Sequence, residues 1–262
     1  MIPDFHIHTD FSADSETPVR HQVEQAVSLG MKEICITDHH DYDAISKDMT
    51  FILDTDAYLS CLRQIQEEYR GQIRVNIGVE LGLQSHIKEY LRQYTNRYSF
   101  DFIIGSSHFI DGMDPYYPDF FAGKTAKEAY HRYFEVTLKR LRALECFDSF
   151  GHLDYPARYG PEYHWHDHRD YIDAILKTLI QKGRALECNT GGCKYGQGHP
   201  NPHQGILTRY RELGGELLTI GSDAHVPGQL GGRFRQLPAL LRDCGFRYYT
   251  VYHERKPEFI PL

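Results

Sequence analysis

Histidines and carboxylates recur along this chain at a spacing that indicates a metal site. His6 and His8 lie one residue apart at the end of the first apolar run. Alternate residues of a strand point to the same side, so this His-x-His pair aims both imidazoles at one place. Imidazole and carboxylate ligands suit Zn, Mn or Fe, and a carboxylate such as Glu80 can bridge two ions. The sequence therefore predicts a metal-dependent enzyme.

Other possible ligands, or partners of ligands, stand at the ends of later apolar runs. They are Asp38, His39, Glu80, His108, His152, Asn189, Asp223 and His225. Taken singly each has an ordinary explanation: an isolated His108 is more often a polar residue near the core, and a lone Asp223 can cap the next turn. Ordinary structural roles do not explain their joint placement at successive strand ends.

Short β-rich runs and helical patterns alternate, and this alternation must position the candidate ligands. A first helix is expected between a Thr17 cap and Gly30, with Pro18 in its first turn. The β-rich runs are 2–7, 33–37, 73–79, 102–106, 149–151, 185–188, 217–221 and 247–252. The other helical patterns are 56–69, 87–98, 125–144, 170–182, 203–213 and 237–244. Repeated strand, helix and parallel strand predict a parallel sheet covered by helices.

The number of repeats favours closure of this α/β sheet into a TIM-like barrel over an open sheet. Four irregular stretches, 38–54, 109–123, 155–168 and 191–202, are longer than a typical connection. Each follows a strand, so all four should wall an active site on one face of the barrel. Because no linker rich in Pro, Gly or Ser divides the chain, we expect residues 1–262 to form one domain rather than two smaller ones.

Composition limits the classes of protein that this chain can represent. It has 262 residues, 16 histidines and a net charge of −7, which disfavours nonspecific binding to nucleic acid. The six cysteines contain no CxxC pair and are predicted to be reduced. The start of the chain has no basic region followed by an apolar one, and no run approaches the ~20 apolar residues of a membrane span. We therefore expect a cytoplasmic protein without a nucleic-acid or membrane partner.

These residues lie in motifs that resemble those of the polymerase and histidinol phosphatase (PHP) phosphoesterases, in the family's order and across nearly the whole chain. The motifs are Phe5-His6-Ile7-His8-Thr9 with Ser12 and Asp14, Ile36-Thr37-Asp38-His39, Gly78-Val79-Glu80, Ser106-Ser107-His108, Gly151-His152-Leu153-Asp154 and Gly221-Ser222-Asp223-Ala224-His225. The histidinol-phosphatase branch is the most similar. Its substrate segments resemble residues 155–159, which include Arg158, and Glu187-Cys188-Asn189-Thr190-Gly191 followed by Lys194.

The resemblance implies a distorted (βα)7 barrel that holds up to three divalent ions, of Zn, Mn or Fe. His6, His8, Glu80 and Asp223 would hold the first ion, Glu80, His108 and His152 the second, and Asp14, His39 and His225 the third. Asp14 departs from relatives that carry histidine there, and its harder oxygen ligand affects which ion the third site prefers.

The resemblance also implies a phosphomonoester hydrolase in which a metal-bridging hydroxide attacks phosphorus. The predicted catalytic residues are Asp223, His225 and Arg158. The predicted substrate-binding residues are Arg158, Lys194, His40 and Asn189. Lys194 stands where this branch commonly has arginine, so it supplies charge without the planar fork of a guanidinium.

The substrate expected from the resemblance is a small phosphate ester, L-histidinol phosphate, hydrolysed to L-histidinol and phosphate in histidine biosynthesis. One alternative is a PHP phosphoesterase that acts on nucleotides or other small phosphates, and another is a noncatalytic metal-binding PHP module. An amidohydrolase-like barrel also uses His-x-His, but Glu80 as the bridge, without an evident carboxylated lysine, argues against it. The oligomeric state and the residues that recognise the amine and imidazole stay open.

Overall fold

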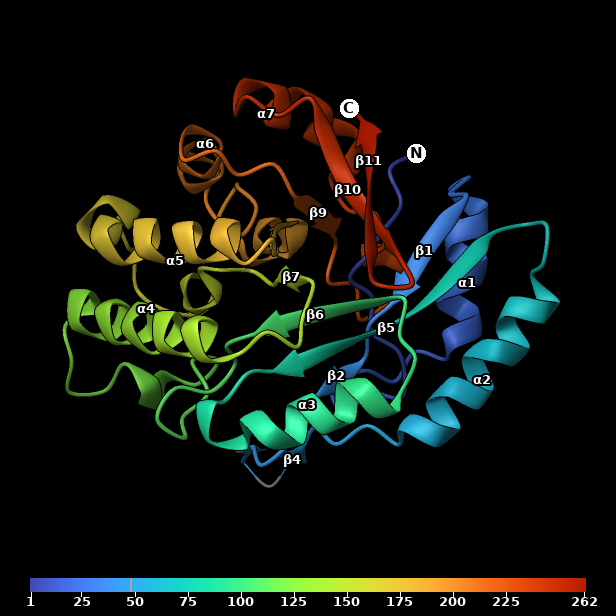
Figure 1. Ribbon diagram of the computed structural model, residues 1–262, viewed down its shortest axis with the longest axis horizontal. Coiled ribbons are helices and arrows are strands. Elements are labelled where there is room, and N and C mark those ends of the chain that lie inside the picture. Colours follow the sequence, from blue (N-terminus) through green and yellow to red (C-terminus); the bar gives the residue numbers. More distant parts are fainter. Residues whose placement is uncertain (48) are drawn as a thin grey trace.

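A curled parallel sheet forms the centre of the computed structural model, which describes residues 1–47 and 49–262 (Figure 1). Its strands are β1 (Glu33–Ile36), β2 (His39–His40), β5 (Arg74–Gly82), β6 (Phe102–Ser106), β7 (Ser149–Phe150), β8 (Ala185–Asn189) and β9 (Leu218–Gly221). They pair in the order β1-β5-β6-β7-β8-β9, with β2 also on β5, and every pair is parallel. Apolar runs such as Phe-Ile-Ile in β6 are buried because helices cover parallel sheets.

The extended segment from Asp4 to His8 joins the two ends of this sheet. On one side it pairs with β1, where Cys35 N donates to Asp4 O at 2.8 Å. On the other side Phe5 N donates to Ile220 O at 3.1 Å and His8 N to Ala224 O at 2.8 Å. Together with the six strands from β1 to β9, the segment supplies the seventh position of the predicted distorted barrel, and the α/β fold class is confirmed.

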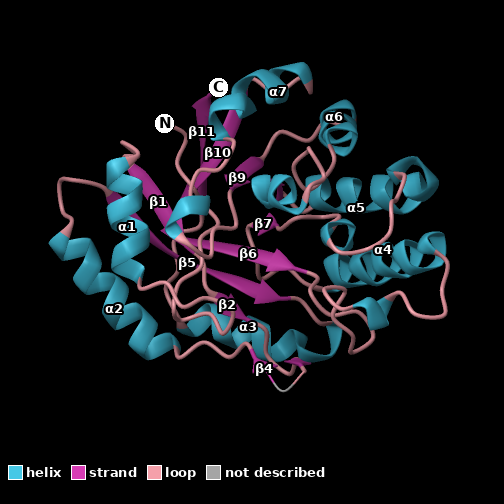
Figure 2. Ribbon diagram, turned by 180° about the vertical axis from the view of Figure 1, so that it is seen from behind, coloured by secondary structure: helices cyan, strands magenta, loops and turns pink. Residues whose placement is uncertain are grey.

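Helices surround the sheet, as the views from both sides show (Figures 1 and 2). They are α1 (Val19–Ser28), α2 (Thr55–Glu68), α3 (Lys88–Arg97), α4 (Ala126–Ala143), α5 (Arg169–Gln181), α6 (Gln204–Glu212) and α7 (Leu237–Asp243). Helix α4 begins with a capping box between Thr125 and Glu128, and its buried face includes Tyr133, Phe134 and Leu141. The seven helices match the expected ranges to within one or two residues at each end.

The structure corrects the expected cap of the first helix and adds a strand to the last β-rich run. Thr17 does not cap α1: Pro18 is the N-cap residue, and the Thr17 hydroxyl donates to His225 O at 2.8 Å. The last β-rich run is β10 (Tyr248–His253), which pairs with a second strand, β11 (Lys256–Pro261), that was not predicted. Their turn uses Glu254 and Arg255 at positive φ of 49° and 65°. The usual Asn-Gly signature of such a turn is missing, and this hid the hairpin.

The four long connections gather at one end of the barrel, as predicted. The first, expected at 38–54, contains the small hairpin of β3 (Ile45–Ser46) and β4 (Met49–Thr50), and residue 48 of it lies outside the described residues. Short 3-10 helices lie in the last three of these connections: η2 (Pro118–Phe120), η3 (Tyr155–Arg158), η4 (Trp165–His168) and η5 (Thr190–Tyr195). Three more, η1 (Ser85–Ile87), η6 (Pro227–Gln229) and η7 (Phe234–Gln236), lie elsewhere in the chain. All four connections contribute side chains to one cleft.

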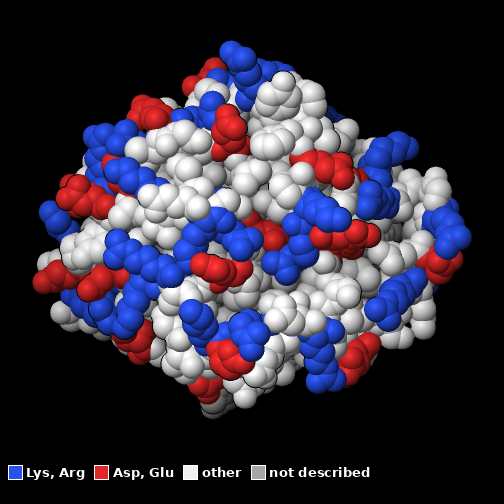
Figure 3. Space-filling view, in the orientation of Figure 1, with Lys and Arg blue, Asp and Glu red and all other residues white. Residues whose placement is uncertain are grey.

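The cysteines and the surface agree with a folded globular chain. All six cysteines are free thiols. On the face shown in Figure 3, Lys and Arg alternate with Asp and Glu without a continuous basic stripe. Among residues 1–47 and 49–262, no helix has both the length and the apolar character needed to cross a bilayer.

His253 connects the terminal hairpin to the barrel and should make stability depend on pH. Its ring contacts Glu33 of β1 and, at 2.8 Å, Glu258 of β11. Burial opposes the charged ring, but the hydrogen bonds to Glu258 and Glu33 outweigh it and raise the pKa of His253. A raised folded-state pKa stabilises the fold fully below the unfolded value, about 6.5, and this stabilisation is lost as the pH rises through the folded value.

We therefore expect His253→Gln to reduce the free energy of unfolding by about 0.5–1 kcal/mol more at pH 5.5 than at pH 8.5, because the pair is partly exposed. Urea unfolding at the two pH values measures this difference. His86→Gln is the control, since His86 and its partner Asp43 are 59% and 62% exposed, and its effect should be small at both pH values. An equal loss for His253→Gln at both pH values would contradict the expectation.

Candidate metal centre and active site

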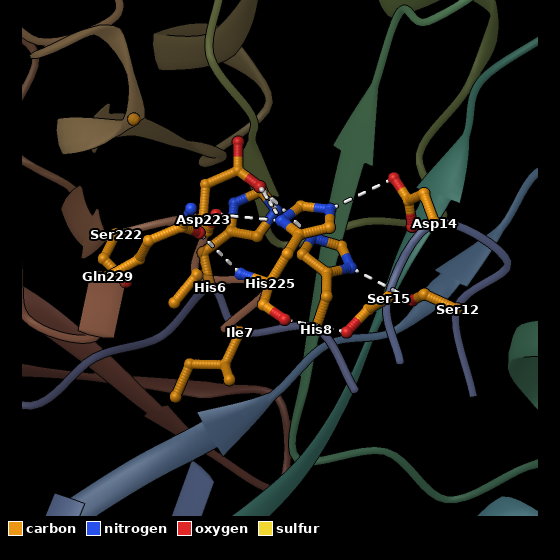
Figure 4. Close-up of polar contacts among 12 residues, drawn as sticks. His6, Ile7, His8, Ser12, Asp14, Ser15, Ser222, Asp223, His225 and Gln229 are labelled. Carbon is orange, nitrogen blue, oxygen red and sulfur yellow. Dashed lines mark hydrogen bonds and ion pairs between the residues drawn. The ribbon is translucent and has the colours of Figure 1, made fainter. Parts of the chain in front are cut away.

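The carboxyl ends of the parallel strands bring the predicted ligands together. His6 and His8 come from the closing segment, and Glu80 lies within β5. His108 and His152 follow β6 and β7, and Asp223 and His225 follow β9. Figure 4 shows His6, His8, Asp14, Asp223 and His225 pointing toward one another. Six of the nine predicted ligands are buried, while Asp14, His39 and His225 are partly exposed at the cleft.

Glu80 lies at the centre of this cluster and is fully buried. Its Oε2 atom is 3.2 Å from His6 Nε2 and 3.4 Å from His8 Nε2. Its Oε1 atom is 3.1 Å from His108 Nε2 and 2.9 Å from His152 Nε2. Burial alone would raise the pKa of Glu80, but the surrounding imidazoles, His6 foremost, hold it well below its ordinary value. The Oε2 atom of Glu80 also lies 3.1 Å from His39 Nδ1. The two oxygens therefore face different groups of imidazoles, which is the arrangement of a bridging carboxylate.

Asp223 completes the first predicted set. Its Oδ1 atom lies 3.3 Å from His8 Nε2 and 3.7 Å from His6 Nε2. The Asp223 backbone has a positive φ of 57°, a conformation that aspartate adopts more readily than most residues. Gly221 before it is required by packing, since a Cβ atom there would lie 2.3 Å from His6 Cβ. Local backbone geometry thus aims this carboxylate at the His-x-His pair.

Several buried atoms of the cluster lack the partners that buried polar atoms need. His6 Nε2, His8 Nε2, His39 Nδ1, Asp41 Oδ2 and Glu80 Oε2 have no hydrogen-bond partner among the described residues. An unsatisfied buried polar atom costs about 1–3 kcal/mol. These atoms converge, and imidazole nitrogens with carboxylate oxygens are ligands for Zn, Mn or Fe. The residues present therefore fit bound divalent cations.

The third predicted set lies at the more exposed side of the cluster. Asp14 Oδ2 is 3.1 Å from His225 Nε2 and 3.6 Å from His39 Nε2. Burial opposes ionisation of Asp14, but the His39 and His225 rings outweigh it and hold the pKa of Asp14 below its ordinary value. The His8 ring stacks on both the His39 ring and the His225 ring, with centroid distances of 4.3 Å and 4.2 Å. The structure therefore brings all nine predicted ligands into one cluster.

Two acidic residues that sequence reasoning did not assign support this cluster. Asp41 accepts a hydrogen bond from His108 Nδ1 at 2.8 Å and lies 3.5 Å from His39 Nδ1. Glu187 accepts one from His6 Nδ1 at 2.6 Å and another from His152 N at 2.7 Å. Carboxylates that hold the second ring nitrogen fix the orientation of ligand imidazoles. Two-residue alternation was the available signal, because Asp41 follows His39 and Glu187 precedes Asn189 by two positions.

The structure places Asp38 and Asn189 close to the cluster. Asp38 accepts hydrogen bonds from Thr9 and Ser12, and the Ser12 hydroxyl lies 3.1 Å from His8 Nδ1. Asn189 contacts the His6 ring at 3.3 Å and accepts a hydrogen bond from Arg158. Both side chains contact the groups that hold the ligands.

Arg158 lines the cleft and makes three hydrogen bonds within the protein. Its guanidinium donates to Asp223 Oδ2 at 2.7 Å, to Asn189 Oδ1 at 2.9 Å and to Asn201 Oδ1 at 2.8 Å. Burial opposes its charge, but Asp223 outweighs that effect and raises the pKa of Arg158. Its position suits two tasks: holding a proposed metal ligand and presenting positive charge to the cleft.

Lys194 and His40, the other predicted substrate contacts, lie in different places. Lys194 Nζ donates to Asp223 O at 2.5 Å and lines the cleft. His40 does not reach the cleft, since its ring contacts Tyr90 OH at 2.8 Å, accepts from Leu53 N at 3.2 Å and stacks 4.2 Å from the Tyr94 ring. Successive residues of a strand point to opposite sides, so His39 faces the cluster and His40 faces away. This position does not support substrate binding by His40.

The cleft above the cluster is large enough for a small molecule. It has a volume of about 510 Å³. Its lining includes the cluster residues His39, His108, His152, Asp223 and His225, the basic residues Arg158 and Lys194, and the aromatic residues Phe51, Phe109, Tyr116, Tyr117, Tyr155, Tyr159 and Tyr195. A polar and cationic floor under aromatic walls can bind an anionic group beside an organic one.

Comparison with known proteins agrees with this geometry. Residues 4–191 match the PHP domain family, and the chain belongs to this family. It is 32% identical over 261 residues to the histidinol-phosphatase of Lactococcus lactis, covering 97% of this chain and 95% of that protein. It is 33% identical over 263 residues to a probable histidinol-phosphatase of Clostridium acetobutylicum, covering 98% of each.

Solved structures of other proteins have a similar fold. The crystal structure of the histidinol phosphate phosphatase from Lactococcus lactis, complexed with zinc, L-histidinol and phosphate, superposes with a TM-score of 0.90, at 32% identity and 98% coverage of both chains. A putative histidinol phosphatase from Listeria monocytogenes, at 20% identity, has a TM-score of 0.76 and covers 89% of this chain and 99% of that one, which supports the fold alone.

Proposed function

We propose that this protein is a metal-dependent phosphatase that hydrolyses L-histidinol phosphate to L-histidinol and phosphate. The observation that carries the proposal is the position of the Glu80 carboxylate, whose two oxygens face two separate groups of imidazoles. The substrate comes from the relative of known structure, which was crystallised with zinc, L-histidinol and phosphate.

The chain's own residues divide the work of the reaction. Bound divalent ions would supply an activated water and neutralise phosphate oxygens. Asp41 and Glu187 hold the rings of His108 and His6, so the ligand geometry is fixed before substrate arrives. Arg158 and Lys194 place positive charge at the cleft, where the phosphate must enter. His225 lies between Asp14 and Asp223, which positions its ring at the same end of the cleft.

Metal analysis coupled to a phosphatase panel tests this proposal. We expect the purified protein to contain Zn, Mn or Fe, to lose activity on chelation, and to regain it when one of these ions is added back. Among L-histidinol phosphate, nucleoside monophosphates and p-nitrophenyl phosphate, we expect the first to have the highest kcat/KM. Higher kcat/KM for nucleotides would favour a different phosphoesterase of this family. A metal-loaded protein without phosphatase activity would favour a noncatalytic module.

We further propose that residues 1–262 form one domain, which is supported by a single hydrophobic core whose members run from Phe5 to Tyr252. A cytoplasmic location and the lack of a nucleic-acid partner stay predictions from composition. The individual roles assigned to the site residues are likewise proposals, and the variants described below test them.

A further inference from the structure

One carboxylate of the cleft is not part of the metal cluster. Asp114 lines the cleft from the connection after β6. The other carboxylates of the lining, Asp14, Asp41 and Asp223, each contact a histidine of the cluster. Asp114 instead accepts hydrogen bonds from Ser46 Oγ at 3.0 Å and Tyr116 N at 2.9 Å, with Tyr155 OH at 3.5 Å. These three donors are neutral, so they leave the negative charge of an ionised Asp114 uncompensated.

A carboxylate in this cleft is unfavourable for a substrate that carries only negative charge. A phosphate monoester is itself an anion, and like charges close together in a partly buried site repel. Burial also raises the pKa of Asp114, which means that ionisation is costly there without a cationic partner. A substrate cation at Asp114 would offset both the repulsion and the cost of ionisation. Arg158 and Lys194 would then receive the phosphate.

Tyr155 lies between Asp114 and the metal cluster in the cleft. The Tyr155 ring lies 5.1 Å from the His152 ring and 5.5 Å from the His108 ring, and its hydroxyl points to Asp114. Asp114 is therefore one tyrosine side chain away from the proposed ion sites. In L-histidinol phosphate the amine is on the second carbon from the ester oxygen, so one cleft of about 510 Å³ can hold both the amine and the phosphate.

The aromatic residues beside Asp114 add to the attraction for a cation. Tyr116 and Tyr117 line the same part of the cleft as Asp114. The Lys47 ammonium already lies over the Tyr117 ring, 3.9 Å from its centroid. This contact is an example of the attraction between an aromatic face and a cation, but that face is taken by Lys47.

We propose that Asp114 binds the protonated amine of the substrate and so selects aminoalkyl phosphates over phosphate esters that lack a cation. The inference rests on the proposed function and deepens it, because it assigns a residue to the amine.

The test compares wild-type protein, Asp114→Asn and Asp119→Asn on three esters. These are L-histidinol phosphate, its deamino analogue that keeps the imidazole, and p-nitrophenyl phosphate. Asparagine keeps the size of the side chain and an acceptor for Tyr116 N. We expect Asp114→Asn to lower kcat/KM for L-histidinol phosphate by about 10- to 100-fold, mainly through KM. Activity on the other two esters should be kept or should rise, because the variant removes a carboxylate that repels an anionic ester, and retained activity also shows that the variant is folded.

Asp119→Asn is the matched control, since Asp119 is exposed on the same connection and does not line the cleft. It should match wild type on all three esters. The inference is overturned if Asp114→Asn leaves kcat/KM for L-histidinol phosphate unchanged or lowers it equally for the deamino analogue. If the wild type hydrolyses the two amine-free esters but not L-histidinol phosphate, the proposed function fails as well, so the two failures are distinguishable.

Discussion

Glu80→Ala should abolish turnover and remove bound metal while leaving most of the barrel folded. The substitution deletes both oxygens that face His6 and His8 on one side and His108 and His152 on the other. Losing several kcal/mol of stabilisation at the reacting phosphate corresponds to a rate loss on the order of 10³-fold or more. Phosphatase assays, metal content and circular dichroism measure the three expected results.

Glu89→Gln is a suitable control because Glu89 is 63% exposed on α3 and pairs with Arg92 at the surface. It should keep full activity and metal content. Turnover retained by Glu80→Ala with a full complement of metal would refute the bridging role. Unchanged stability and metal content with lost turnover would instead indicate that Glu80 acts on the substrate rather than on the ions.

Arg158→Met should reduce both stability and activity, because the guanidinium is the partner of a buried carboxylate. The Arg158 and Asp223 side chains are only 4% and 6% exposed, and their nearest atoms are 2.7 Å apart. Removing one member of a buried ion pair costs about 3–5 kcal/mol. We expect a loss of this size in urea unfolding of the metal-free protein. A fall in kcat/KM of about 100-fold or more should accompany it, since Asp223 is a proposed ligand.

Lys194→Met gives the comparison, since Lys194 contacts the same residue through its backbone oxygen rather than its carboxylate. Lys194 is also more exposed to solvent than Arg158. Lys194→Met should change the free energy of unfolding by less than about 1 kcal/mol. Its kcat/KM should fall if the Lys194 ammonium contacts the phosphate of the substrate. Equal losses of stability in the two variants would show that the Arg158 and Asp223 pair does not stabilise the fold. Arg158→Lys should recover part of the stability but not the three-way contact, because an ammonium lacks the planar fork.

Much of the fold could be predicted because its strands are apolar and its helices have clear ends. The β6 strand and helices α4 and α5 were predicted nearly to the residue, since buried parallel strands and capped amphipathic helices leave strong local patterns. The β10–β11 hairpin was only half predicted because β11 is largely exposed and its turn lacks glycine. Exposed strands carry little hydrophobic pattern, so the sequence offers a weak indication of them.

The sequence by itself determined which residues could bind metal and at which end of the barrel they lie. His6, His8 and Glu80 stand in strands or directly after them, and the carboxyl ends of parallel strands must share one face. Because alternate residues of a strand point to the same side, the sequence also indicates that His39 and Asp41 face one side and His40 the other. The direction of each side chain depends on the periodicity of its own strand, so it can be predicted from that segment alone.

Tertiary structure alone decided how these residues contact one another. Arg158 and Asp223 are 65 positions apart, and His6 and Glu187 are 181 apart. No local pattern specifies that one guanidinium joins Asp223, Asn189 and Asn201, or that Asp114 faces the same cleft as the metal cluster. Such contacts arise only when strands and long connections from distant parts of the chain meet at one end of a closed sheet, because loop conformation is set by packing rather than by periodicity.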